Sequence, residues 1–225
     1  WLALTLEPTL EPEMPICDPH HHFWDFRTAR IPHQRYLLHE LAADINSGHN
    51  VRSTVFVEAR SMYRTHGPEQ MRPVGEVEFV QGMAAASASG LYGPGRVAAA
   101  IVGHANLNLG DMVAPVLEAL QVASPNRFRG VRHSVTFDSN PAVENTAAHA
   151  IQGQLASDGF RAGARVLAQK GLSLEGWLFF HQLPELANFA KAIPSLTIIL
   201  NHIGGLLRDG PYANRDEEVL ATWRN

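Results

Sequence analysis

The chain has 225 residues, of which 45% are hydrophobic and 18% are charged, and its net charge is −4 at pH 7. This is the composition of a globular protein with a sizeable core. The acidic balance and the lack of a basic stripe in the sequence argue against nucleic acid as a partner, and the opening run WLALTL is too short to span a membrane. We therefore expect a cytoplasmic protein that binds a small-molecule substrate.

Six short runs rich in β-branched and apolar residues predict buried strands, at residues 14–17, 53–59, 96–103, 130–135, 176–181 and 196–202. The first run contains Cys17, the only cysteine, which excludes a disulfide and which we expect to be buried and unreactive. Apolar residues at helical spacing predict helices around residues 113–120, 160–167 and 183–193. This alternation predicts βαβ units and one parallel sheet.

Polar residues follow most of these strands, as they do at the carboxyl ends of the strands in a (β/α)8 TIM barrel. A doubly wound open sheet is the alternative, but no G-x-G-x-x-G sequence follows the first strand. Only six βα units are found, so we predict one barrel domain over residues 1–225 that lacks its last two units. The strand edges left open would be covered by further residues or by a homo-oligomer.

The stretch DPHHH, Asp18 to His22, follows the first predicted strand directly. Residues i and i+2 of a strand point to the same side, so His20 and His22 would both face the barrel mouth, where they could bind one divalent ion. Asp18 shares their side and could orient a ligand. The alternative is a histidine-rich loop, or two histidines that are hydrogen-bonded to carbonyl groups.

Two later histidines extend this candidate site. His181 ends the fifth predicted strand and is the best candidate for a third metal ligand. His202 ends the sixth and precedes a Gly-Gly turn; it could be a ligand, but we favour a substrate hydrogen-bond partner or general acid/base. Trp24, just after the histidine pair, is a candidate to bind the face of a sugar.

The segments DPHHHFWD, STVFVEA, FRGVRHSV and FFHQLPELANFAKAIPSLTIILNHIGG resemble the amidohydrolase-2 family of metal-dependent hydrolases, which have the TIM-barrel fold. Within that family, the branch of sugar lactonases, sulfomuconolactone hydrolases and pyrone-dicarboxylate lactonases is the most similar. The similarity runs in the expected order from Pro15 to Gly205. The resemblance implies a lactonase that uses a divalent metal, zinc before manganese, although some members are metal-free.

The resemblance also implies residue roles. His20, His22 and His181 would be metal ligands. Arg132 would be catalytic with His202. His133 and Glu58 would contact the substrate.

One expected catalytic group is not in the sequence. The resemblance implies a general-base aspartate at the end of an eighth strand, which would lie beyond residue 225. Asp209 and Asp216 follow the sixth strand and do not match it. Two alternatives to a lactonase therefore stay open: a non-oxidative decarboxylase of an aromatic or unsaturated acid on the same metal frame, and an inactive barrel fragment that acts as a binding module.

Overall fold

A curved parallel sheet forms the centre of the molecule. The computed structural model describes residues 7–26, 34–144 and 151–224. Six strands make up the sheet: β1 (Pro15–His21), β4 (Asn50–Val57), β5 (Arg96–Gly103), β6 (Phe128–Arg132), β7 (Ser173–Gly176) and β8 (Ile198–Leu200). Every neighbouring pair is parallel, and the strands lie side by side in chain order. The predicted α/β fold, an incomplete barrel, is confirmed.

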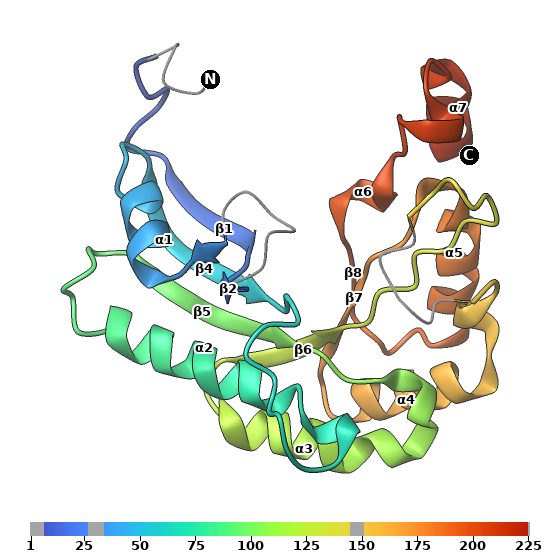
Figure 1. Cartoon of the computed structure of the whole chain (residues 1–225), viewed down its shortest axis with the longest axis horizontal. Coiled ribbons are helices and arrows are strands. Elements are labelled where there is room, and N and C mark those ends of the chain that lie inside the picture. The colour runs from blue at the N-terminus through green and yellow to red at the C-terminus, as the bar shows by residue number, and fades with distance from the viewer. Residues whose placement is uncertain (1–6, 27–33, 145–150, 225) are drawn as a thin grey trace.

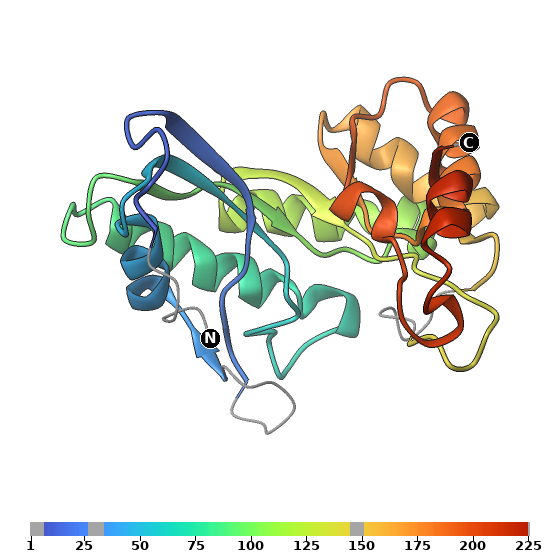
Figure 2. The same ribbon diagram turned by 90° about the horizontal axis from the view of Figure 1, so that it is seen from above.

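Helices connect the strands and cover the outer side of the curve (Figures 1 and 2). They are α1 (Leu38–Ile45), α2 (Val74–Ser87), α3 (Ala114–Ala123), α4 (Asp158–Gln169) and α5 (Leu183–Ala192), followed by α6 (His202–Gly205) and α7 (Asp216–Arg224). Short 3-10 helices are η2 (Glu69–Met71), η3 (Leu107–Val113), η4 (Gln154–Ala156), η5 (Phe180–Gln182) and η6 (Gly210–Tyr212). A hairpin pairs β2 (Trp24–Asp25) with β3 (Arg35–Tyr36). None of the helices in the described ranges has the length and apolarity that crossing a bilayer requires.

The hydrophobic core lies between the sheet and this outer layer. Helix α4 shows how the sequence builds it. The side chain of Ser157 caps the helix by accepting a hydrogen bond from the backbone N–H of Phe160. Phe160, Ala164 and Leu167 share one face and are fully buried, as their helical spacing predicts.

Four of the predicted strands extend past the carboxyl ends of β4, β6, β7 and β8, and the predicted run 176–181 shares only Gly176 with β7. Strand β7 ends at Gly176 and β8 ends at Leu200, so His181 and His202 lie in short helical turns after the strands rather than in them. The side chain of Gln182 explains the first case, because its Oε1 accepts hydrogen bonds from the backbone N–H groups of Phe137 and Phe179 and closes the turn. An apolar run alone does not show where a strand leaves the sheet.

The prediction that Cys17 is buried is wrong, because this side chain is exposed. Strand β1 is an edge strand of the described sheet and pairs only with β4 there. Its side chains consequently alternate between exposed and half-buried along most of the strand. A strand that is apolar in sequence is fully buried only where both of its faces are covered.

Helix α4 approaches η3 so closely that Gly163 leaves no room for a side chain. A Cβ atom at Gly163 would lie 2.3 Å from the backbone oxygen of Leu107. We expect Gly163→Ala to lower the free energy of unfolding by about 1–3 kcal/mol, because the backbone of η3 must move. Gly82 in α2 is the control: a Cβ there meets nothing within 4 Å, so Gly82→Ala should raise it by about 0.5–1 kcal/mol. Urea denaturation measures both, and equal effects would contradict this account of the packing.

Candidate active site

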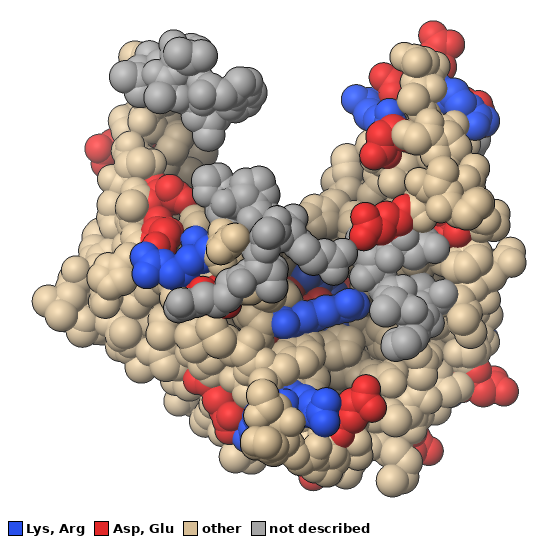
Figure 3. All heavy atoms as spheres, in the orientation of Figure 1, with Lys and Arg blue, Asp and Glu red and all other residues tan. Residues whose placement is uncertain are grey.

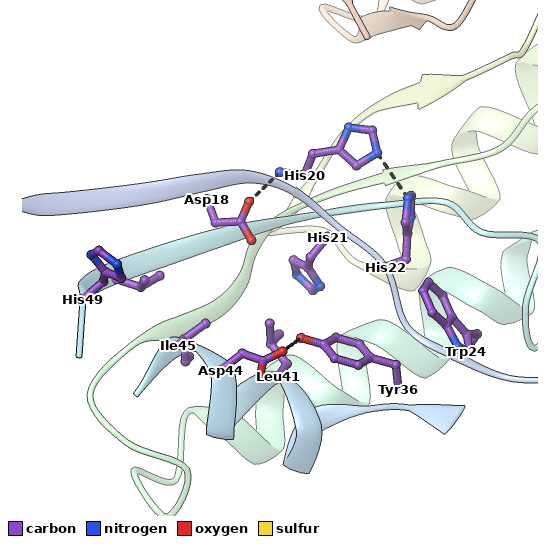
Figure 4. A pocket seen from close by; sticks show the side chains of 11 residues that line it. Asp18, His20, His21, His22, Trp24, Tyr36, Leu41, Asp44, Ile45 and His49 are labelled. Carbon is purple, nitrogen blue, oxygen red and sulfur yellow. Dashed lines mark hydrogen bonds between the residues drawn. The ribbon is translucent and has the colours of Figure 1, made fainter. Parts of the chain in front are cut away.

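The carboxyl end of β1 presents two histidines to the inner side of the sheet. The Nε2 atoms of His20 and His22 lie 3.2 Å apart, with the two rings nearly perpendicular. Figure 4 shows both rings on one side of the strand and His21 on the other. Asp18 accepts a hydrogen bond from the backbone N–H of His20 at 3.1 Å, which fixes the turn of the chain here. The alternation predicted for His20, His21 and His22 is therefore present, but it does not extend to Asp18, because the strand register is irregular between Asp18 and His21.

The hydrogen bonds of the pair define which nitrogen carries each proton. Nδ1 of His22 lies 2.7 Å from the carbonyl oxygen of Val57, which can only accept, so Nδ1 carries the proton and Nε2 carries the lone pair. Nη1 of Arg132 lies 3.3 Å from Nε2 of His20, and because a guanidinium can only donate, this Nε2 is also an acceptor. Both Nε2 lone pairs therefore face one shared space, and in these tautomers the 3.2 Å contact between the two Nε2 atoms carries no proton and is not a hydrogen bond.

Arg132 connects the His20–His22 pair to Glu58, the residue that follows β4. It is the last residue of β6, and its side chain reaches past β5 to Glu58, which follows β4 directly. Nε donates to the Glu58 carboxylate at 2.9 Å, and Nη2 donates to the Glu58 backbone oxygen. The two side chains are only 11% and 6% exposed. Such a buried ion pair fixes the direction of the guanidinium, which leaves Nη1 for the mouth of the sheet.

Burial keeps the histidines neutral. Burial, and then the neighbouring His22 and the Arg132 charge, lower the pKa of His20 to about 3. Burial also lowers the pKa of His22, although its bond to the Val57 carbonyl acts in the opposite direction. At neutral pH both imidazoles therefore keep the lone pairs that a metal ion requires.

His202 and Trp24 complete the rim. The His202 ring centroid lies 5.0 Å from that of His20 and 4.6 Å from that of Trp177. Partial burial and the Arg132 charge lower the pKa of His202, so it can accept a proton at neutral pH. The Trp24 ring lies 6.1 Å from the ring of His22. The structure thus brings His202, Trp24, Glu58 and Arg132 together around the histidine pair.

Two predicted site residues are not brought to this cluster. Nε2 of His181 lies 3.0 Å from the carboxylate of Asp138, and its ring stacks on Tyr212. His133 directly follows Arg132, the last residue of β6, and is buried against Phe160, where its Nδ1 accepts a hydrogen bond from the backbone N–H of Leu107 in η3. Their predicted roles in metal and substrate binding stay predictions.

The histidine pair fits two positions of a metal site. Two nitrogens that bind one tetrahedral ion at about 2.0–2.1 Å lie about 3.3–3.4 Å apart, close to the observed separation. Within the described residues, however, no group of three or more His, Cys, Asp and Glu side chains could hold a metal ion. His20 and His22 therefore form two ligands of a site whose further ligands the described residues do not supply in this arrangement.

Sequence reasoning missed one carboxylate beside the cluster. Glu175 lies opposite Arg132 in the β6–β7 register and is 3% exposed. Its carboxylate accepts a hydrogen bond from Asn201 at 2.5 Å, and burial raises its pKa. A glutamate inside the apolar run GLSLEGWLFF was the signal that could have revealed it.

A pocket borders β1. On the side of the strand that carries His21, it has a volume of about 440 Å³ and extends toward α1 (Figure 4). Its lining includes His21, Tyr36 and Asp44, in addition to the edge of the histidine pair. Figure 3 shows acidic and basic side chains interspersed over the face of the molecule in view.

An incomplete parallel barrel with an H-x-H pair at the carboxyl end of its first strand is an arrangement typical of TIM-barrel enzymes that bind a metal ion. The family model described as amidohydrolase matches residues 17–224. The chain belongs to this family, which confirms the resemblance found in the sequence. The uncharacterized protein y4mH of Sinorhizobium fredii is 27% identical over 216 residues, which cover 88% of this chain and 65% of that protein.

Solved structures of low identity share the fold. An amidohydrolase from Burkholderia multivorans with bound zinc has a TM-score of 0.61 and 22% identity, covering 92% of this chain and 63% of that one. A probable 2-pyrone-4,6-dicarboxylic acid hydrolase from Acinetobacter baumannii with bound citric acid has a TM-score of 0.53 and 15% identity, covering 93% and 65%. The chain thus spans somewhat less than two thirds of the length of these relatives.

Proposed function

We propose that this chain carries the metal-binding and substrate-binding part of a hydrolase that opens a sugar-derived or dicarboxylic lactone. The observation that carries the proposal is the convergence of two neutral Nε2 lone pairs beside an oriented arginine. Family membership and the hydrolases among the structural relatives support it. Zinc is the metal that two imidazoles favour, with manganese as the second candidate.

Each residue of the cluster has a separate role in the proposed reaction. His20 and His22 would hold the ion, which when bound supplies a water of lowered pKa and polarises the lactone carbonyl. An ion on Nε2 of His20 removes the acceptor that Nη1 of Arg132 uses here. Arg132 is then free to donate to the substrate oxygen on which negative charge develops. Glu58 keeps the guanidinium in place, and neutral His202 can take up or return a proton.

The test combines metal analysis with a product assay on protein expressed from the complete reading frame. Wild-type protein should retain a divalent metal and release protons from members of a lactone panel. His20→Ala and His22→Ala should lose the metal and about 100-fold or more in kcat/KM. His49→Ala, a change of an exposed histidine, is the control for the substitution itself.

Other outcomes would point elsewhere. Release of CO₂ from hydroxybenzoate-type acids without lactone opening would assign a decarboxylase. Wild-type protein that is fully active without metal would exclude the metal-based mechanism. Tight metal binding with neither activity would favour a binding module.

A further inference from the structure

A buried glutamate in α2 contacts the segment that follows β4, next to the candidate active site. Glu76, in the first turn of α2, is 0% exposed. Its Oε1 accepts hydrogen bonds from the backbone N–H groups of Ala59 at 2.9 Å and Ser61 at 2.8 Å. The hydroxyl of Ser61 in turn donates to the backbone oxygen of Phe23 at 2.7 Å. Glu76 and Ser61 together thus connect a helix to the segments that follow two different strands.

The segment held by Glu76 has an unfavourable backbone. Arg60 and Met62 have φ angles of 57° and 54°, in the left-handed region that is costly for residues other than glycine. Glu76 binds the N–H groups on both sides of Arg60, which stabilises this turn. Burial, with the nearby charge of Glu58, raises the pKa of Glu76 to about 8, so the carboxyl group is mostly neutral at pH 7. It therefore acts as a hydrogen-bond acceptor and not as a charge.

Both connected segments carry residues of the candidate active site. Ala59 follows Glu58, the ion-pair partner of Arg132. Phe23 follows His22, whose own ring is bonded to Val57 at the end of β4. The His22 side chain and the carbonyl group of the next residue, Phe23, are therefore both hydrogen-bonded to the segment 57–61.

We propose that Glu76 and Ser61 are positioning residues that hold the carboxyl ends of β1 and β4 together, and we call this pair the Glu76–Ser61 latch. By fixing the carbonyl group of Phe23, which directly follows His22, the latch aims the His22 Nε2 lone pair into the space it shares with His20. By fixing the turn after Glu58, it maintains the direction of Arg132. The effect on metal binding rests on the proposed function, whereas the effect on His22 and Arg132 does not.

Ser61→Ala tests the half of the latch that contacts β1. The wild-type His22 ring should show the Nδ1–H tautomer in ¹⁵N NMR spectra, because Nδ1 donates to Val57. Ser61→Ala should give a mixture of tautomers and weaken zinc binding about 10-fold, as loss of a group that orients a ligand does. Ser87→Ala is the matched control. This buried serine lies at the carboxyl end of α2 and donates a hydrogen bond to the backbone oxygen of Gly95, so the His22 tautomer and the zinc affinity should be unchanged.

Two substitutions of Glu76 test the other half. Glu76→Gln keeps an acceptor for the Ala59 and Ser61 N–H groups and should preserve the His22 tautomer and the slow exchange of the Arg132 Nε–H. Glu76→Met fills the volume without an acceptor and should accelerate that exchange at least 10-fold. Glu78→Gln, an exposed change on the same helix, is the control.

The outcomes are separable. Wild-type His22 and Arg132 signals in both Ser61→Ala and Glu76→Met would overturn the latch. If Glu76→Met does not fold, Ser61→Ala alone decides. If wild-type protein binds no zinc and opens no lactone, the proposed function fails, while the tautomer and exchange measurements still decide whether the latch exists.

Discussion

Replacement of Arg132 by methionine is expected to lower the free energy of unfolding by about 3–5 kcal/mol and to abolish the proposed lactone hydrolysis. Methionine fills most of the volume but leaves the Glu58 carboxylate, which is 5% exposed, without its counter-charge. Among the described residues the second oxygen of this carboxylate already lacks a hydrogen-bond partner, so nothing nearby compensates for the loss. Urea denaturation and kcat/KM on a responsive lactone measure the two effects.

A double substitution separates stability from function. Arg132→Met combined with Glu58→Met removes both charges, and a buried ion pair replaced by apolar side chains of similar volume is often no less stable. We expect the double variant to recover most of the stability while remaining inactive, since Arg132 is the proposed donor to the substrate. A double variant with a loss equal to the sum of the two single losses would show that the side chains do not interact.

Acidification is expected to destabilise the protein between about pH 6.5 and pH 4. Burial is the main cause that lowers the pKa of His21 to about 4 and that of His133 to about 3, while an unfolded histidine titrates near 6.5. As the pH falls through this range the unfolded chain binds protons that the folded chain does not, so stability is full above about pH 6.5 and is lost below it. The loss is at most of the order of 3 kcal/mol for each histidine.

Substitutions of His133 and His21 can show whether these two residues cause the loss of stability at low pH. In His133→Asn the amide oxygen can still accept the hydrogen bond from the Leu107 N–H, and in His21→Gln the amide can still reach Thr54. Each should flatten the decline in unfolding free energy from pH 6.5 to 4, and His49→Asn should leave it unchanged. Glu76 acts with the opposite sign, because its raised pKa favours the folded state as the pH falls below about 8. Slopes that the two substitutions leave unaltered would disprove the assignment.

The sequence was sufficient for the parallel α/β sheet and for the histidine pair, because alternating strands and helices and the i, i+2 pair both follow from short-range periodicity. The same rule could have separated Arg132 from His133, since neighbouring residues of a predicted strand face opposite sides, and here Arg132 contacts Glu58 whereas His133 contacts Phe160. The Arg132–Glu58 pair was not predictable, because it joins residues 74 positions apart. His181 was predicted to end a strand, but β7 ends five residues before it, at Gly176. The chain turns there because the Gln182 side chain accepts backbone hydrogen bonds, and the hydrophobic pattern of the sequence does not reveal such bonds.

The long reach of Arg132 has a consequence for how the protein folds. Arg132 and His20 are separated by 112 positions in the chain, and β4, β5 and β6 must be paired before their side chains can meet. Contacts of such high sequence separation carry a large loop-closure entropy and form late. Refolding protein should therefore regain most of its secondary structure first and its capacity to bind a ligand at this site last.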